Sequence, residues 1–183
     1  MKRMILEETD IVDVIKITPE IYEDERGFFF ESFNEKHFFR AIGSDLTFVQ
    51  DNHSRSKKGV LRGLHYQIKN PQGKLVRVIR GSVFDVVVDL RKASKTFGKH
   101  YHLELTESNK TQLWIPPGMA HGFLALSDFA EVVYKTTDYW SPEYERTLVW
   151  DDPKLSIDWP SKKTLLSKKD SEGCLFSEAE LFN

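Results

Sequence analysis

The sequence predicts an all-β protein, a sandwich or barrel with a few short helices. Short segments rich in apolar and β-branched residues recur at nearly even spacing, at 101–105, 111–115, 121–126 and 129–136. Turn-forming residues separate them, at 98, 107–109, 116–118 and 127–128. Many short strands joined by regular turns are typical of β-sandwiches and barrels.

The strongest strand signals lie in residues 74–90. Residues 74–80 and 83–90 have strand character and the pair Gly81-Ser82 lies between them, so a β-hairpin is predicted. In the second of these strands the residues of one parity are predicted to face the core: Phe84, Val86, Val88 and Leu90. Asp85 and Asp89 have the other parity and belong to the opposite face.

One short helix is expected at residues 34–42. Phe38 and Phe39 fall beside Ile42 at helical spacing, Asn34 can cap the start, and Gly43 can end it. From about residue 153 onward the chain is polar, and we expect loops and short helices that pack on the barrel. No repeat or linker divides the chain, so one domain over residues 1–183 is expected.

Composition excludes several classes of function. A net charge of −2 argues against a general nucleic-acid or anionic-membrane binder, so any anion site must be a local cluster of cations. Cys174 is the only cysteine, which excludes an intramolecular disulfide. No stretch approaches the roughly 20 apolar residues of a membrane span, and acidic residues follow the N-terminus closely. A cytoplasmic protein is therefore expected.

Motif searches exclude the common nucleotide and hydrolase sites. The chain has no phosphate loop, no G-x-G-x-x-G fingerprint, no G-x-S-x-G elbow and no H-E-x-x-H. His100 and His102 come nearest to a metal pair, but they lie in a strand-like segment, where such a pair usually marks a solvated face.

The first polar segments that suit chemistry lie between residues 24 and 67, and each also has a purely structural interpretation. Arg26 belongs to a charged turn before an aromatic edge strand, or pairs with a phosphate or carboxylate. Arg62 and His65 face opposite sides of a regular strand, so they serve one cavity only if the strand bulges near Gly63. Without a bulge, His65 is a core histidine.

Three further segments lie later in the chain. Lys74 has the parity of neighbouring valines, so it either extends to the sheet end or occupies a cavity. Tyr134 faces inward, as a core tyrosine or as a phenol with a polar partner. His121 begins a strand after a Pro-x-Gly turn, and the adjacent glycine allows close approach of a ligand or a strand. The Lys168-Lys169-Asp170 run alone would be a solvated charge cluster.

In combination, these segments resemble the dTDP-4-dehydrorhamnose 3,5-epimerase family over nearly the whole chain. The motifs are Arg26-Gly-Phe, Gln50-Asp-Asn52, Leu61-Arg-Gly-Leu-His65-Tyr-Gln67, Gly73-Lys74, Pro116-Pro-Gly-Met-Ala-His121-Gly-Phe, Tyr134 and Asp170. The resemblance implies a cupin-type jelly roll that forms a homodimer. It implies a dTDP-sugar substrate, dTDP-4-dehydro-6-deoxy-D-glucose, and the product dTDP-4-dehydro-L-rhamnose, with no cofactor.

The resemblance also implies roles for individual residues. His65 would be the catalytic base, Asp170 its carboxylate partner, Lys74 the stabiliser of the enolate, and Tyr134 the acid. The positions that match substrate-binding residues are Arg26, Glu31, Gln50, Asn52, Arg62, His121, Trp140, Glu145 and Lys169. Trp140 stands where the family commonly has a tyrosine that stacks on thymine. Met119 is a small departure within its motif.

No catalytic metal is expected. Related metal-dependent cupins carry His-x-His in the first motif, where this chain has His65-Tyr-Gln67. With His121 only two candidate ligands remain, one short of a usual protein set.

Several alternatives stay open at this point. The nearest is a single-position epimerase or a ketoisomerase on a related dTDP-4-keto-6-deoxysugar. A metal-dependent cupin and a non-catalytic sugar-nucleotide-binding module are the others. Finally, the aromatic segment 28–30 would be an aggregation risk if left exposed, so we expect this N-terminal strand to cross to a partner subunit.

Overall fold

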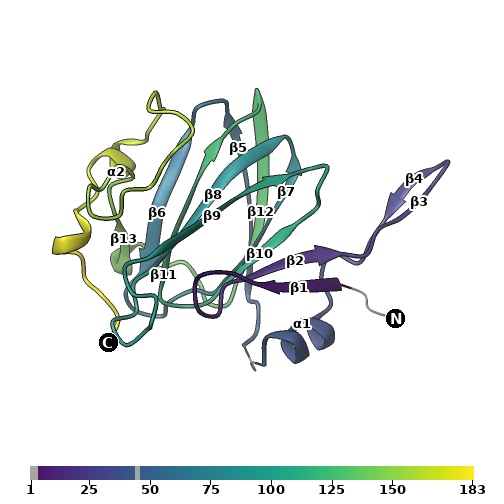
Figure 1. Ribbon diagram of the computed structural model, residues 1–183, viewed down its shortest axis with the longest axis horizontal. Helices are drawn as coiled ribbons and strands as arrows, with labels where there is room; N and C mark the ends of the chain where they lie inside the picture. Colours follow the sequence, from purple (N-terminus) through teal and green to yellow (C-terminus); the bar gives the residue numbers. More distant parts are fainter. Residues whose placement is uncertain (1–3, 44–45) are drawn as a thin grey trace.

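The computed structural model of the protein describes residues 4–43 and 46–183, and it confirms the all-β prediction. Two antiparallel sheets form a sandwich (Figure 1). The first sheet has the strand order β1 (Met4–Glu8), β2 (Ile15–Pro19), β10 (Gln112–Ile115), β7 (Lys74–Arg80), β12 (Phe129–Thr136) and β5 (Gln50–Lys57). The second has the order β13 (Glu145–Thr147), β6 (Leu61–Gln67), β11 (Met119–Ala125), β8 (Ser82–Asp89) and β9 (His100–Thr106).

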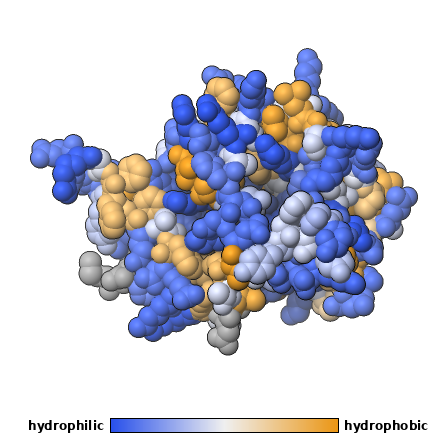
Figure 2. Space-filling model, turned by 180° about the vertical axis from the view of Figure 1, so that it is seen from behind, coloured by the Kyte–Doolittle hydropathy of each residue, from blue (hydrophilic) through white to orange (hydrophobic). Residues whose placement is uncertain are grey.

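A third pair of strands lies outside the sandwich. Strands β3 (Tyr22–Asp24) and β4 (Gly27–Phe29) form a hairpin that projects from the body (Figure 1). Phe28 and Phe29 on this hairpin are 57% and 71% exposed. Seen from behind, hydrophobic surface lies beside the hydrophilic tip of this projection (Figure 2). The hairpin therefore leaves two aromatic side chains largely exposed, although Lys110 lies over the Phe28 ring.

The predicted helix is confirmed with both of its caps. Helix α1 (Glu35–Ile42) begins after Asn34, whose side chain accepts a hydrogen bond from the His37 backbone N–H, and ends at Gly43 in the left-handed region. Phe38 packs with Leu75 and Trp114, so α1 covers part of the outer face of the first sheet. Within the described residues, the helices are all too short or too polar to span a membrane.

The predicted hairpin of residues 74–90 is wrong. The two strands exist, but β7 pairs with β10 and β12, whereas β8 pairs with β11 and β9 in the other sheet. Gly81, with φ of 73°, carries the chain from one sheet to the other, and its N–H donates to Glu107 instead of to a hairpin partner. A tight turn can join two paired strands of one sheet or two strands of different sheets, so the local pattern does not distinguish a hairpin from a crossing between sheets.

Strand β8 is buried on both faces. The predicted core face, with Val86, Val88 and Leu90, packs beneath the C-terminal tail. The opposite face is also buried, because Val83 and Val87 belong to the core between the sheets and Asp85 is fully buried there. This second buried face places a carboxylate inside the sandwich.

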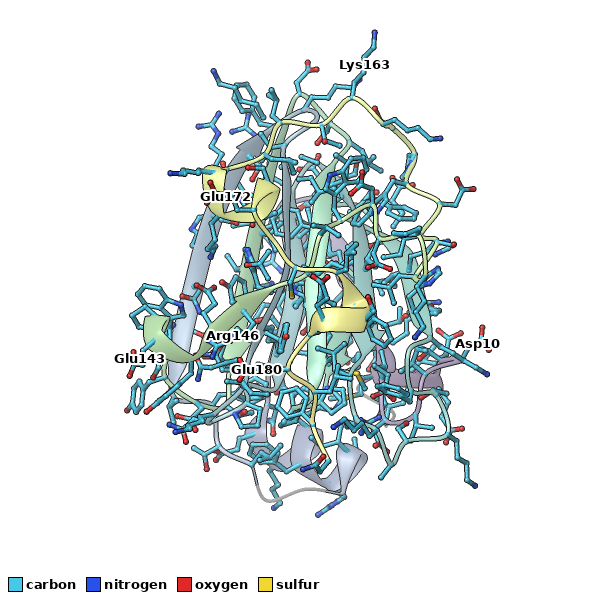
Figure 3. The ribbon with its side chains drawn as sticks, turned by 90° about the vertical axis from the view of Figure 1, so that its left-hand side faces the viewer. Asp10, Glu143, Arg146, Lys163, Glu172 and Glu180 are labelled. Atoms are coloured by element: carbon cyan, nitrogen blue, oxygen red, sulfur yellow. The ribbon has the colours of Figure 1, made fainter. Side chains whose placement is uncertain are left out.

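The segment from about residue 150 onward packs on the outer face of the second sheet. Trp159 and Phe176 bury their rings against Leu61, Leu64 and Val88 of that sheet. The tail includes α2 (Lys168–Ser171) and the 3₁₀ turn η2 (Phe176–Glu178); a further 3₁₀ turn, η1 (Pro142–Tyr144), precedes β13. In Figure 3 the tail crosses the strands, and Glu180 forms an ion pair with Arg146 of β13. This packing fixes α2 beside β6.

Candidate active site

A cavity of about 330 Å³ lies between the two sheets and gathers most of the predicted site residues. The ones that line it are Gln50, Asn52, Arg62, His65, Lys74, His121, Tyr134, Trp140, Glu145 and Lys169. Asp170 stands behind this lining and contacts His65. His65 and His121 come from the second sheet, whereas Lys74 and Tyr134 come from the first. Catalytic candidates therefore face the same space from opposite walls.

Strand β6 bulges where the sequence requires it. His65 lies opposite His121, but Arg62 lies opposite Phe123, so β6 has one more residue than β11 between these two pairs. Gly63 adopts φ of 116°, and a Cβ there would lie 2.5 Å from the Gly122 Cα. Only glycine fits this approach of two backbones. The bulge lets Arg62 and His65 line one cavity despite their opposite parity.

His65 and Asp170 form a hydrogen-bonded pair. His65 Nε2 lies 2.5 Å from Asp170 Oδ1, and the Ser167 hydroxyl donates to the other carboxylate oxygen at 2.7 Å. Ser167 is also the N-cap of α2, so the helix start orients the carboxylate. Burial alone would raise the pKa of Asp170, but the hydrogen bonds from His65 and Ser167 outweigh it and lower the pKa. Asp170 is therefore an anion at neutral pH.

The electrostatics keep the imidazole of His65 neutral. Burial lowers its pKa below 6.5; the bond to Asp170 opposes this shift, while the cations of Lys169 and Lys74 add to it. With Nε2 engaged by the carboxylate, proton exchange with a substrate falls to Nδ1. His65 thus has the protonation state and orientation of a general base.

Lys74 is a buried cation. It is 8% exposed, and its Nζ donates to the His65 backbone carbonyl at 3.4 Å. Burial lowers the pKa of Lys74 to about 8, although the carboxylates of Glu145 and Asp85 act in the other direction. The side chain is an ammonium at neutral pH, and it occupies the cavity, which is one of the two positions left open by its parity.

Tyr134 lines the cavity from the first sheet. Burial raises the pKa of its phenol, Glu145 raises it further, and Arg62 acts against both. The phenol therefore keeps its proton throughout the neutral range and can donate it.

Arg62 and Lys169 add positive charge to the cavity. Arg62 Nε donates to Ser56 Oγ at 2.9 Å, and Lys169 pairs with Glu145 at 3.0 Å. Together with Lys74, they form a local cation cluster in a chain of net charge −2. Such a cluster suits an anionic ligand such as a diphosphate.

Arg26 and Glu31 do not join the cavity of their own chain. Arg26 lies on the turn of the β3–β4 hairpin with its side chain 85% exposed, and it pairs with Asp24. Glu31 Oε1 lies 3.3 Å from His37 Nδ1, at the start of α1. Nothing in the local sequence pattern distinguishes these two positions from the other predicted site residues.

Asp85 is a site residue that the sequence did not predict. His121 Nε2 lies 3.0 and 2.9 Å from the two Asp85 oxygens, and both side chains are buried. The available signal was the parity of Asp85, which it shares with Val83 and Val87; an apolar neighbourhood on that face indicates a buried carboxylate with a polar partner.

No metal centre is formed by the residues that the structure describes, because no three His, Cys, Asp or Glu side chains gather in a suitable group there. His102 is exposed on β9 and stacks on Phe84, in agreement with a solvated face.

Comparison with known proteins identifies the family. The family model described as dTDP-4-dehydrorhamnose 3,5-epimerase matches residues 8–178. The dTDP-4-dehydrorhamnose 3,5-epimerase of Pseudomonas aeruginosa is 57% identical over 173 residues, which cover 94% of this chain and 96% of that protein.

Two solved structures extend the comparison. The dTDP-6-deoxy-D-glucose-3,5-epimerase of Legionella pneumophila, in complex with dTDP-4-keto-L-rhamnose, has a TM-score of 0.94 at 50% identity, covering 97% of this chain and 95% of that one. A 3'-monoepimerase from Streptomyces bikiniensis, in complex with dTDP-quinovose, has a TM-score of 0.87 at 33% identity, covering 92% and 86%. The predicted cupin-type fold is thereby confirmed. The chain belongs to the dTDP-4-dehydrorhamnose 3,5-epimerase family.

Proposed function

We propose that the protein inverts C3 and C5 of dTDP-4-dehydro-6-deoxy-D-glucose and releases dTDP-4-dehydro-L-rhamnose. The observation that carries this proposal is the placement of His65 and Tyr134 on opposing sheets around one cavity. A base and an acid on opposite sides of a sugar ring are what an inversion by proton transfer needs.

The ketone at C4 makes the chemistry accessible. It acidifies the hydrogens on C3 and C5, because the carbanion left by either proton delocalises into an enolate. His65 takes the proton from one face of the ring, and the Asp170 carboxylate stabilises the imidazolium that forms. Tyr134 delivers a proton to the same carbon from the other face, and both groups then exchange protons with solvent.

Lys74 stabilises the intermediate between the two transfers. Its ammonium lies in the cavity and is oriented by the His65 carbonyl before any substrate binds. A preorganised donor aimed at a developing oxyanion typically contributes about 3 kcal/mol. Because enolisation moves only protons, the reaction needs no cofactor and no metal.

The remaining residues bind the nucleotide and the sugar. Arg62 and Lys169 hold the diphosphate, and Trp140, 54% exposed at the cavity mouth, stacks on the thymine. Gln50, Asn52, His121 and Glu145 line the same space as polar contacts. The tail supplies Lys169 and Asp170 to this site, so residues 1–183 act as one domain. The protein acts in the cytoplasm, where sugar nucleotides are found.

The protein acts as a homodimer in which the β3–β4 hairpin crosses to the partner. The exposed Phe28 and Phe29 would then be covered, and Arg26 and Glu31 would complete the partner's cavity. Mixing of two inactive variants tests this arrangement. Arg26→Ala and His65→Asn subunits regain activity on mixing if Arg26 acts across the dimer, because one site of each hybrid is then intact. No regain, or a monomer in analytical ultracentrifugation, contradicts it.

Incubation with dTDP-4-dehydro-6-deoxy-D-glucose in D₂O tests the function. Proton NMR of the product should show deuterium at both C3 and C5, with both centres inverted. Label at one carbon alone would assign a single-position epimerase, and absence of label and turnover would refute the proposal.

A further inference from the structure

The segment that carries Trp140 is held by glutamine side chains. Strand β12 ends at Thr136, the Thr137 N–H donates to the Gly73 carbonyl at 3.0 Å, and the backbone groups that follow bond to glutamine amides. Gln72 Nε2 donates to the Asp138 carbonyl at 2.8 Å, and Gln67 Nε2 donates to the Tyr139 carbonyl at 3.2 Å. The Trp140 N–H donates to Gln50 Oε1 at 3.2 Å, and the Ser141 N–H donates to Gln67 Oε1 at 2.9 Å. Four consecutive residues, 138–141, thus each bond to a glutamine, and the Asp138 carbonyl also accepts from the Thr136 hydroxyl at 2.9 Å.

The three glutamines come from different parts of the sandwich. Gln50 begins β5 in the first sheet, Gln67 ends β6 in the second sheet, and Gln72 lies in the connection to β7. These three side chains, called the amide clamp below, therefore connect residues 138–141 to both sheets. A carboxamide can donate to one backbone carbonyl through its nitrogen and accept from a nearby backbone N–H through its oxygen, as Gln67 does here.

The amide nitrogen of Gln67 has no free N–H group to donate to a ligand. Its two N–H groups donate to the carbonyls of Asn70, at 2.7 Å, and of Tyr139. The residue is 4% exposed, although it borders the cavity. Its role is therefore to place the neighbouring segment.

We propose that Gln67 and Gln72 are positioning residues that hold Trp140 as a preformed stacking platform for the nucleoside base. The inference rests on the proposed function, since the base belongs to its substrate. Trp140 is 54% exposed, and hydrogen bonds with Gln50, Gln67 and Gln72 hold the backbone on both sides of it. A platform fixed before binding avoids the ordering cost on binding. Amides do not titrate in the neutral range, so the platform keeps its geometry when pH changes.

Fluorine NMR of the full-length protein labelled with 5-fluorotryptophan tests the clamp without any ligand. The chain has four tryptophans, and Trp140→Phe assigns the relevant signal. In Gln67→Met and Gln72→Met, the Trp140 signal should broaden or split while the other three stay in place, which also reports that the variants fold. An unchanged Trp140 signal in both variants would overturn the proposal.

Gln112→Met is the matched control. Gln112 Nε2 also donates to a backbone carbonyl, that of Ser32 at 2.8 Å, but it lies outside the clamp. The same lost hydrogen bond there should leave the Trp140 signal unchanged. A Trp140 signal that responds equally to Gln112→Met would show a general loosening and would overturn the specific role.

Calorimetry with dTDP and with inorganic pyrophosphate separates the base from the diphosphate. Loss of one positioning hydrogen bond should weaken dTDP binding about fivefold in Gln72→Met, with pyrophosphate affinity unchanged. The KM should rise by a similar factor while kcat stays constant. Equal losses for both ligands, or no loss for dTDP, would contradict the platform. If the wild type fails to turn over the sugar nucleotide, the proposed function fails, whereas the fluorine spectra still decide the clamp.

Discussion

Lys74 is a buried cation, and its replacement should raise the stability of the protein while lowering its activity. Burial lowers its pKa from 10.5 to about 8. That drop of about 2.5 in pKa corresponds to about 3 kcal/mol, because each pKa unit is worth about 1.4 kcal/mol. At pH 7 the lysine is charged in both states, so the folded protein carries this cost in full. Lys74→Met should therefore raise the free energy of unfolding at pH 7 by about 3 kcal/mol.

The sign of the pH dependence follows from the same shift. Between about pH 8 and 10.5 the unfolded chain holds the Lys74 proton and the folded protein has lost it. The wild type should gain stability as pH rises through this range, and Lys74→Met should not. The two stability curves should converge toward pH 10.5.

Urea unfolding followed by tryptophan fluorescence, at pH 7 and at pH 10, measures both curves. The same variant should lose about 10²–10³-fold in kcat, because the enolate oxygen loses its donor. A Lys74→Met protein that is less stable than the wild type at pH 7 would refute the reasoning. So would a wild-type stability that is flat between pH 8 and 10.

Four further predictions concern the site. The kcat/KM should rise with pH through a pKa below 6.5, as neutral His65 forms, and fall through a pKa of about 8, as Lys74 deprotonates; a rate that still climbs beyond about pH 9 would contradict these roles. Asp170→Asn should lower kcat about 10³-fold with little change in KM, measured by steady-state kinetics, because the imidazolium loses its counter-charge; a change under tenfold would argue against the pair. Arg62→Ala should weaken dTDP binding about tenfold in calorimetry with an unchanged circular dichroism spectrum, and unchanged affinity would exclude the diphosphate role. Gly63→Ala should lower the free energy of unfolding by at least about 2 kcal/mol in urea titrations, since a Cβ would lie 2.5 Å from the Gly122 Cα, and a neutral effect would mean that the backbone adapts.

Local patterns in the sequence predicted helix α1 and the strands of residues 74–136, but not strands β1, β2, β5 and β13 and not how the strands pair. The caps Asn34 and Gly43 define α1, because they act on neighbouring backbone groups. The turn at Gly81 connects two correctly predicted strands, yet these strands belong to different sheets. Which strands pair depends on contacts that are distant in the sequence, and a turn of this kind contains no information about them.

The irregular backbone of β6 at the candidate site was predictable from the sequence. Arg62 and His65 face one cavity only through a bulge near Gly63, and the structure has that bulge. Asp85 was not found, because its burial depends on the first sheet lying over that face of β8. Arg26 and Glu31 match substrate-binding positions of the family, but they do not line the cavity of their own chain.

Proton exchange in His65→Asn tests whether His65 is the base for both carbons. The variant is incubated with dTDP-4-dehydro-6-deoxy-D-glucose in D₂O, and deuterium at C3 and C5 is measured by NMR beside the wild type. A single base on one wall of the cavity predicts label at both carbons in the wild type and at neither in the variant. Label that persists at either carbon in the variant would show a second base and would contradict the role of His65.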